Sequence, residues 1–132
     1  MAAAGSPDNR PLSPHLQVWR WHVTMLGSIL HRATGVGLYI GVILFAIWLV
    51  AVAAGPEAYA PIGALLGGPL GQAGLYLLVA ALAFHLANGV RHLVLDTGRG
   101  LKPVDAEASA WFSILFAFAA PIGLWALLTF GG

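Results

Sequence analysis

The segment from Phe84 to Asp96, FHLANGVRHLVLD, holds the side chains best suited to chemistry. It places His85 and His92, with an asparagine and an arginine between them, at the end of an otherwise apolar stretch. A run of about 20 mostly apolar residues crosses a membrane as a helix. Ionisable groups inside a membrane are costly and usually functional. His85 is therefore the first candidate for a functional residue.

The two histidines differ in their expected depth in the membrane, although their spacing places them on one helix face. If the helix ends at Asp96, His85 lies roughly 16 Å inward and His92 about 6 Å inward, at about 1.5 Å per residue. A histidine in the middle of a membrane can be a packing residue, a proton relay or a metal ligand. The residues alone leave all three open.

The metal-ligand interpretation points to haem iron. A neutral imidazole in apolar surroundings suits haem, and Gly89, one turn from His85, leaves room for a flat macrocycle. One histidine fills only one axial position of the iron. Because we expect no other histidine at the depth of His85, a second axial ligand would come from another chain.

A second polar cluster lies at the start of the first apolar stretch. Ser28 has Arg32 at i+4 and His31 at i+3, so the three side chains are neighbours on a helix. His31, Arg32, Arg91 and His92 could pair with haem propionates. The alternative is ordinary anchoring of polar side chains at the membrane surface, which explains each of them equally well.

The composition indicates whether these elements fold in water or in a membrane. The chain has 132 residues, of which 59% are hydrophobic and 8% charged, far too apolar for an ordinary soluble domain. It has no cysteine, so it cannot itself form disulfides, thiolate metal sites or iron–sulfur ligands. We expect an all-α membrane protein.

Three apolar runs predict three transmembrane helices. We expect residues 1–25 to form a cytoplasmic N-terminal segment with an interfacial stretch, and residues 26–130 to form a three-helix transmembrane anchor. The predicted spans are 26–54, 70–95 and 109–130. Prolines and glycines predict a connecting loop over 55–69, and breakers and charges predict another over 96–108.

The basic residues predict the orientation in the membrane. The N-terminal segment through Arg32 and the region from Arg91 to Lys102 hold all six lysines and arginines, whereas the first loop and the C-terminus hold none. Basic residues concentrate on the cytoplasmic side. We therefore expect the N-terminus and the second loop in the cytoplasm, and the first loop and the C-terminus outside. Both polar clusters then face the same side.

Three motifs give the chain a family resemblance. They are RPLSPHL (Arg10 to Leu16), SILHRATG (Ser28 to Gly35) and HLANGVRHLVLD (His85 to Asp96). In this order and spacing they resemble the cytochrome b556 membrane-anchor subunits of succinate dehydrogenase, respiratory complex II. The three-helix layout agrees with that resemblance, which covers most of the chain.

The resemblance implies roles for individual residues. His85 would be an axial ligand of a b-type haem that is shared with a partner anchor subunit. Ser28 and Arg32 would contribute to the ubiquinone pocket, with His31 and Arg32 near a haem propionate. Quinone reduction needs hydrogen-bond donors and protons, and Ser28 and Arg32 supply a hydroxyl and a fixed positive charge. Asp96 could deliver protons, although a solvated carboxylate at a helix end is the simpler interpretation.

The resemblance also implies partners. The chain would join a second membrane-anchor subunit in a heterodimeric helix bundle, together with an iron–sulfur subunit and a flavoprotein subunit. FAD and the iron–sulfur clusters would belong to those partner subunits, and the chain alone would not be catalytic. We expect it in the inner (cytoplasmic) membrane, with a periplasmic C-terminus and no nucleic-acid partner.

Two alternatives come from other functional classes. A small proton-coupled transporter or channel subunit would explain histidines inside the membrane, but three spans give no inverted repeat and only one polar helix face. A structural anchor without haem would have the same topology. The resemblance favours a haem b-binding anchor subunit of succinate:quinone oxidoreductase over both.

Overall fold

The computed structural model describes residues 19–131. Within this range the chain forms α-helices and no strand. The helices are α1 (Val23–Ala54), α2 (Pro56–Gly67), α3 (Pro69–Asp96) and α4 (Pro103–Phe130). The predicted all-α membrane fold is confirmed, because α1, α3 and α4 are each long and apolar enough to cross a membrane. The motif from Arg10 to Leu16 and most of the predicted segment 1–25 lie outside the described residues.

The three long helices exceed the thickness of a membrane core. α1 has 32 residues and α3 and α4 have 28 each, which corresponds to about 48 Å and 42 Å against a core of about 30 Å. Their most apolar 18-residue windows have mean hydropathies of 2.6, 1.7 and 2.0. α3 has the lowest value because it carries the polar segment after Phe84. The ends of each helix therefore reach the headgroup region.

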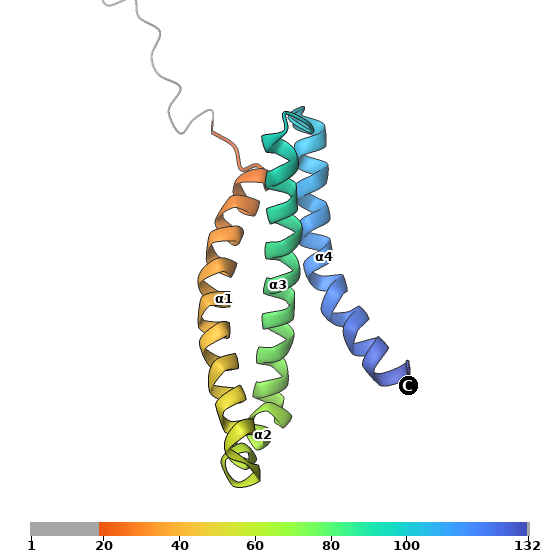
Figure 1. The fold of residues 1–132 in the computed structure, drawn as a ribbon. Helices are drawn as coiled ribbons and strands as arrows, with labels where there is room; N and C mark the ends of the chain where they lie inside the picture. Colours follow the sequence, from red (N-terminus) through yellow and green to blue (C-terminus); the bar gives the residue numbers. More distant parts are fainter. Residues whose placement is uncertain (1–18, 132) are drawn as a thin grey trace, which may run out of the picture.

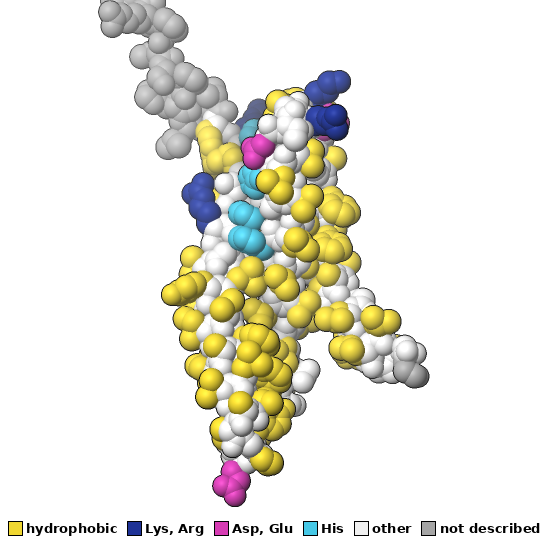
Figure 2. All heavy atoms as spheres, viewed as in Figure 1, with side chains coloured by type: hydrophobic (Ala, Val, Ile, Leu, Met, Phe, Trp, Pro, Cys, Tyr) yellow, Lys and Arg dark blue, Asp and Glu magenta, His cyan; other side chains and the backbone are white. Residues whose placement is uncertain are grey.

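α3 is the central helix of the bundle (Figure 1). It runs alongside α1 over most of its length and contacts α4 on its other flank. Its buried partners on α1 and α4 are mostly small, such as Gly27, Gly41, Ala110 and Ala117. Small residues let membrane helices approach closely. Large apolar side chains of all three helices are instead exposed, and many are visible in Figure 2.

The second half of α4 diverges from α3 in Figure 1. Pro121 lies inside this helix and is buried. Proline lacks the N–H that would bond to the carbonyl of Ala117, and its ring crowds that carbonyl, so the helix bends there. Only the first half of α4 therefore runs close beside α3.

The predicted loop over 55–69 is wrong, because this segment forms the short helix α2. Gly55 reverses the chain with a φ of 106°, a conformation that favours glycine. Pro56 then occupies the first helical turn, where its missing N–H is not needed. Pro61 lies further inside the helix and removes one backbone hydrogen bond. The prediction failed because it treated every proline as a helix breaker, whereas the effect of a proline depends on its position in the helix.

The predicted loop over 96–108 is also longer than the connection that forms. α3 ends at Asp96 and α4 already begins at Pro103. Here too a proline lies in the first helical turn. Gly98 and Gly100 adopt positive φ values of 78° and 70°, which make the tight turn between the two helices.

We predict that Gly41→Leu destabilises the pairing of α1 with α3. A Cβ atom at Gly41 would lie 2.5 Å from Cδ1 of Leu78 on α3, so Leu78 must shift and the seam must repack around a larger side chain. Overpacking of this kind lowers the free energy of unfolding by about 1–3 kcal/mol. The matched control is Gly37→Leu, one turn earlier, where an added Cβ meets nothing within 4 Å.

The measurement is the apparent melting temperature of the full chain in detergent, followed by far-UV circular dichroism. Gly41→Leu should melt earlier than the wild type, and Gly37→Leu should melt at the same temperature or later. Equal melting of the two variants would contradict the close approach at Gly41.

Candidate functional site

Three histidines meet in the seam between α1 and α3. The rings of His31 and His85 are stacked, with centroids 3.8 Å apart and an interplanar angle of 11°. The ring of His92 is tilted against His31, with centroids 5.5 Å apart. In Figure 2 the cyan histidine side chains lie together toward the end of the bundle that carries Lys and Arg.

The expectation that His85 is alone at its depth is therefore wrong. α1 begins at Val23, which places His31 about 12 Å from the helix start at about 1.5 Å per residue. That depth is close to the roughly 16 Å of His85 from the end of α3. Because the two helices run in opposite directions, the two rings arrive at the same level.

Two glycines bring the rings close to the opposite backbones. A Cβ atom at Gly35 of α1 would lie 3.3 Å from Cε1 of His85. A Cβ atom at Gly89 of α3 would lie 3.9 Å from Cε1 of His31. Each glycine thus faces the histidine of the other helix. The space beside Gly89, which we expected to accommodate a macrocycle, faces the His31 ring.

Thr34 contacts His85 across the seam. Its Oγ1 atom lies 3.2 Å from Nδ1 of His85, and it also donates to the Leu30 carbonyl at 2.8 Å. Sequence reasoning missed Thr34 because threonine is common in apolar helices. The signal that could have identified it is its i+3 spacing from His31, which puts both side chains on the same side of α1.

The predicted pairing of Ser28 with Arg32 is present. Arg32 donates from Nη2 to Oγ of Ser28 at 3.3 Å. Arg32 is exposed and Ser28 is half-buried. The hydroxyl of Ser28 accepts this bond and keeps its own hydrogen available for a second partner. The pair therefore presents a hydroxyl donor and a positive charge on the surface of α1.

Arg91 does not join the histidines. Its Nε donates to Oγ of Ser109 at 2.9 Å, and its Nη2 donates to the Ala106 carbonyl at 3.2 Å. Both partners belong to the start of α4, so Arg91 ties α3 to α4. Asp96, the last residue of α3, is exposed. The structure thus brings His31, His85 and His92 together and leaves Arg91 and Asp96 outside that cluster.

Two side chains near the seam carry buried polar atoms without a hydrogen-bond partner in the described part of the chain. They are Nδ1 of His31 and both amide atoms of Asn88, which is fully buried. A Cβ atom at Gly27 of α1 would lie 3.7 Å from Oδ1 of Asn88. Unpartnered buried polar atoms cost about 1–3 kcal/mol each. These atoms are therefore the polar groups near the histidines that still lack a partner within the described residues.

The donor set of the seam suits haem better than a bare metal ion. Over residues 19–131, no group of three or more His, Cys, Asp or Glu side chains could hold a metal ion. Haem iron already has four equatorial nitrogens and needs only axial ligands from protein. His85 can provide one of them, because its contact with Thr34 uses Nδ1 and leaves Nε2.

The fold and this site define a class: a membrane subunit of three spanning helices with a histidine pair between two of them. Residues 6–124 match the family described as succinate dehydrogenase/fumarate reductase transmembrane subunit. The chain belongs to this family. The resemblance inferred from the three motifs is confirmed, and the family is one of subunits of an enzyme complex. The proton-coupled transporter alternative has no comparable support.

Named relatives agree with the family. The chain is similar to the mitochondrial succinate dehydrogenase cytochrome b560 subunit of Homo sapiens, at 36% identity over 91% of this chain and 72% of that protein. It is 42% identical to the cytochrome b556 subunit of Paracoccus denitrificans, over 77% of this chain and 78% of the relative. It is 30% identical to the cytochrome b556 subunit of Rickettsia felis, over 89% of this chain and 92% of that protein.

Proposed function

We propose that this chain is the haem b-binding membrane anchor of a succinate:quinone oxidoreductase and helps to form its quinone-reduction site. The observation that carries the proposal is the position of His85. Its ring lies between two membrane helices, with one nitrogen engaged by Thr34 and its face covered by His31. The names of the relatives, cytochrome b556 and b560, support haem b as the group that this histidine binds.

In this proposal His85 would hold the haem iron through Nε2. The stacked ring of His31 covers a face of the imidazole, whereas the lone pair of Nε2 lies in the ring plane, so the stack leaves this direction open. A companion anchor subunit would supply a second ligand, because the His31 ring stacks beside His85 and does not face it across an iron. Bound haem b supplies a one-electron redox centre.

Polar groups around His85 are suited to the haem propionates. Nδ1 of His31 is buried without a partner, and Arg32 and His92 are exposed at the same end of the seam. Charge-assisted hydrogen bonds from such groups to carboxylates are stronger than hydrogen bonds between neutral groups. Arg91 contributes less, because two of its donors already bond to α4.

The Ser28–Arg32 pair forms this chain's part of the ubiquinone site. Reducing a quinone to a quinol takes two electrons and two protons, and the carbonyl oxygens gain negative character on the way. The hydroxyl of Ser28 donates to one carbonyl while the charge of Arg32 stabilises that oxygen. Asp96, exposed at the end of α3, delivers protons from the cytoplasm.

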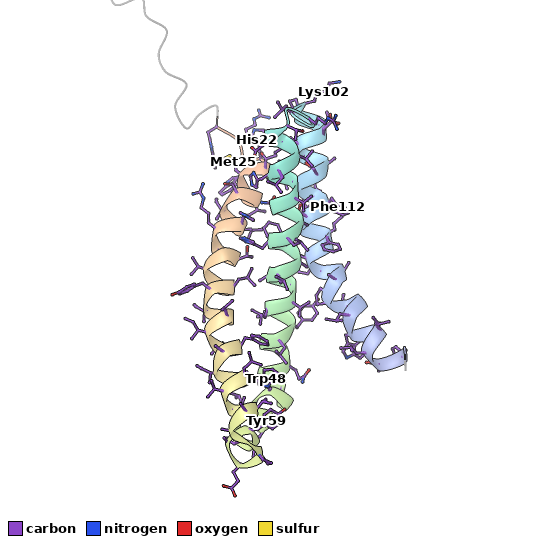
Figure 3. All side chains as sticks on the ribbon, viewed as in Figure 1. His22, Met25, Trp48, Tyr59, Lys102 and Phe112 are labelled. Carbon is purple, nitrogen blue, oxygen red and sulfur yellow. The ribbon has the colours of Figure 1, made fainter. Side chains whose placement is uncertain are left out.

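The ends of the bundle differ in charge, which supports the proposed orientation. Figure 3 shows His22 and Lys102 at one end and Trp48 and Tyr59 at the other. The basic end lies in the cytoplasm, where the iron–sulfur and flavoprotein subunits dock and hold the FAD and the clusters. The exposed apolar flanks of the helices face lipid and the second anchor subunit. The chain is then a multi-pass protein of the inner membrane.

We predict that His85→Ala abolishes haem binding. The variant removes the only axial ligand that this chain provides, and the measurement is the reduced-minus-oxidised absorption spectrum of the purified complex. His22→Ala is the matched control, since His22 lies beside Glu107 at the membrane surface, with Nδ1 3.7 Å from Oε1. Survival of the b-type band in His85→Ala would sink the ligand assignment and show that haem is held by other residues.

We predict that Ser28→Ala slows quinone reduction and spares the haem spectrum. Loss of one hydrogen bond of about 1.5 kcal/mol to the reacting oxygen lowers kcat/KM about 10-fold. Ser113→Ala is the control, because the buried Ser113 hydroxyl bonds only to the backbone of its own helix. Succinate-driven reduction of a soluble ubiquinone analogue measures the effect, and unchanged kinetics in Ser28→Ala would remove this residue from the site.

We predict that the two ends of the bundle lie on opposite sides of the inner membrane in cells. The chain has no cysteine, so Glu57→Cys and Lys102→Cys each introduce a single thiol into it. A membrane-impermeant maleimide added to intact cells with a permeable outer membrane should label position 57, which is periplasmic. It should label position 102 only after the inner membrane is opened. The reverse pattern would show that the proposed orientation is inverted.

A further inference from the structure

The contact between Thr34 and His85 is a hydrogen bond whose donor can be identified from the neighbours of the Thr34 hydroxyl. A threonine hydroxyl carries one hydrogen and two lone pairs. Oγ1 of Thr34 lies 2.8 Å from the Leu30 carbonyl, 3.1 Å from the His31 carbonyl and 3.2 Å from Nδ1 of His85. Three neighbours thus compete for one hydrogen.

The Leu30 carbonyl must receive that hydrogen. Two oxygens 2.8 Å apart are at the usual length of an O–H···O hydrogen bond, and without a hydrogen between them their lone pairs would repel. A bond from a threonine hydroxyl to the carbonyl four residues earlier is also a common arrangement inside helices. Oγ1 therefore presents a lone pair to the ring of His85.

It follows that Nδ1 of His85 is the donor. If Nδ1 lacked a hydrogen, two lone pairs would face each other at 3.2 Å in a half-buried seam. A neutral imidazole has only one N–H, so a hydrogen on Nδ1 leaves Nε2 with its lone pair. This is the form of histidine that can bind iron through Nε2.

We infer that Thr34 is a positioning residue that fixes the tautomer and the orientation of His85 for iron ligation. The inference rests on the proposed haem ligation by His85. Partners of this kind hold a ligating histidine in place and raise its basicity, and their loss typically costs 10–100-fold in metal affinity. Gly35, next to Thr34, supports the arrangement because its missing side chain lets the ring lie against α1.

The test compares three variants of the assembled complex. Thr34→Val keeps the shape of the side chain and removes the hydroxyl, whereas Thr34→Ser keeps the hydroxyl. Thr129→Val is the matched control, because Oγ1 of Thr129 makes the same bond to the carbonyl four residues earlier, also at 2.8 Å, with no hydrogen bond to a histidine among residues 19–131. The readouts are haem content per complex and the midpoint potential of the haem in a redox titration.

Thr34→Val should weaken haem retention about 10-fold and raise the midpoint potential, because a less basic imidazole stabilises ferric iron less well. Thr34→Ser should restore both values, and Thr129→Val should change neither. A wild-type potential in Thr34→Val would overturn the inference. So would a Thr34→Ser variant that behaves like Thr34→Val, because the role would then belong to the shape of the side chain.

A second measurement separates this inference from the ligation proposal. Nitrogen NMR of the isotope-labelled, haem-free full chain reports which ring nitrogen of His85 carries the hydrogen, with the signal assigned by its loss in His85→Ala. We expect Nδ1–H in the wild type and in Thr34→Ser, and a mixture of tautomers in Thr34→Val. A hydrogen on Nε2 in the wild type would overturn the role of Thr34. A wild-type complex without haem would instead overturn the ligation by His85.

Discussion

The close approach of α1 to α3 is the constraint on which the rest of the structure depends. Inside a membrane little water reaches the polar groups of a side chain, so these groups depend on partners within the protein. Gly35 and Gly89 let each histidine ring lie against the opposite backbone. That approach makes both the histidine stack and the Thr34 contact possible. Bulky side chains at the glycines would break these interactions together.

Because α1 lies close to α3, its residues belong to two candidate sites. His31 and Thr34 contact α3 across the seam, whereas Arg32 is exposed and bonds to Ser28 one turn earlier on its own helix. In the proposed function, one side of α1 orients the haem ligand and an adjacent side meets the quinone. A displacement of α1 would therefore disturb both sites, which is why separate readouts for haem and quinone are needed.

Much of the fold could be predicted from hydropathy, because a run of apolar residues has few alternatives to a membrane helix. The short helix α2 could not, since Pro56 lies in the first turn, where a helix tolerates proline, and the helix forms despite Pro61 in its interior. Within the site, the Ser28–Arg32 pair followed from spacing along one helix. The level of His31 and the contact of Thr34 depend on how two helices align. The bonds of Arg91 to α4 could not be predicted for a related reason, because they depend on how α4 packs against α3.

The distribution of ionisable side chains limits what the proposed site can do with protons. Between Arg32 and Glu57, between Glu57 and His85, and from residue 108 onward, the sequence has no Asp, Glu, His, Lys or Arg. Apart from Glu57 on α2, the half of the bundle away from Asp96 thus offers no such group to relay protons across the membrane through this chain. In the proposed function, protons for a quinone beside Ser28 therefore come from the end that carries Asp96, the end at which the electrons would also arrive. Quinone reduction at the proposed site would then move no net charge across the membrane through this subunit, unlike the reaction of a proton-coupled transporter.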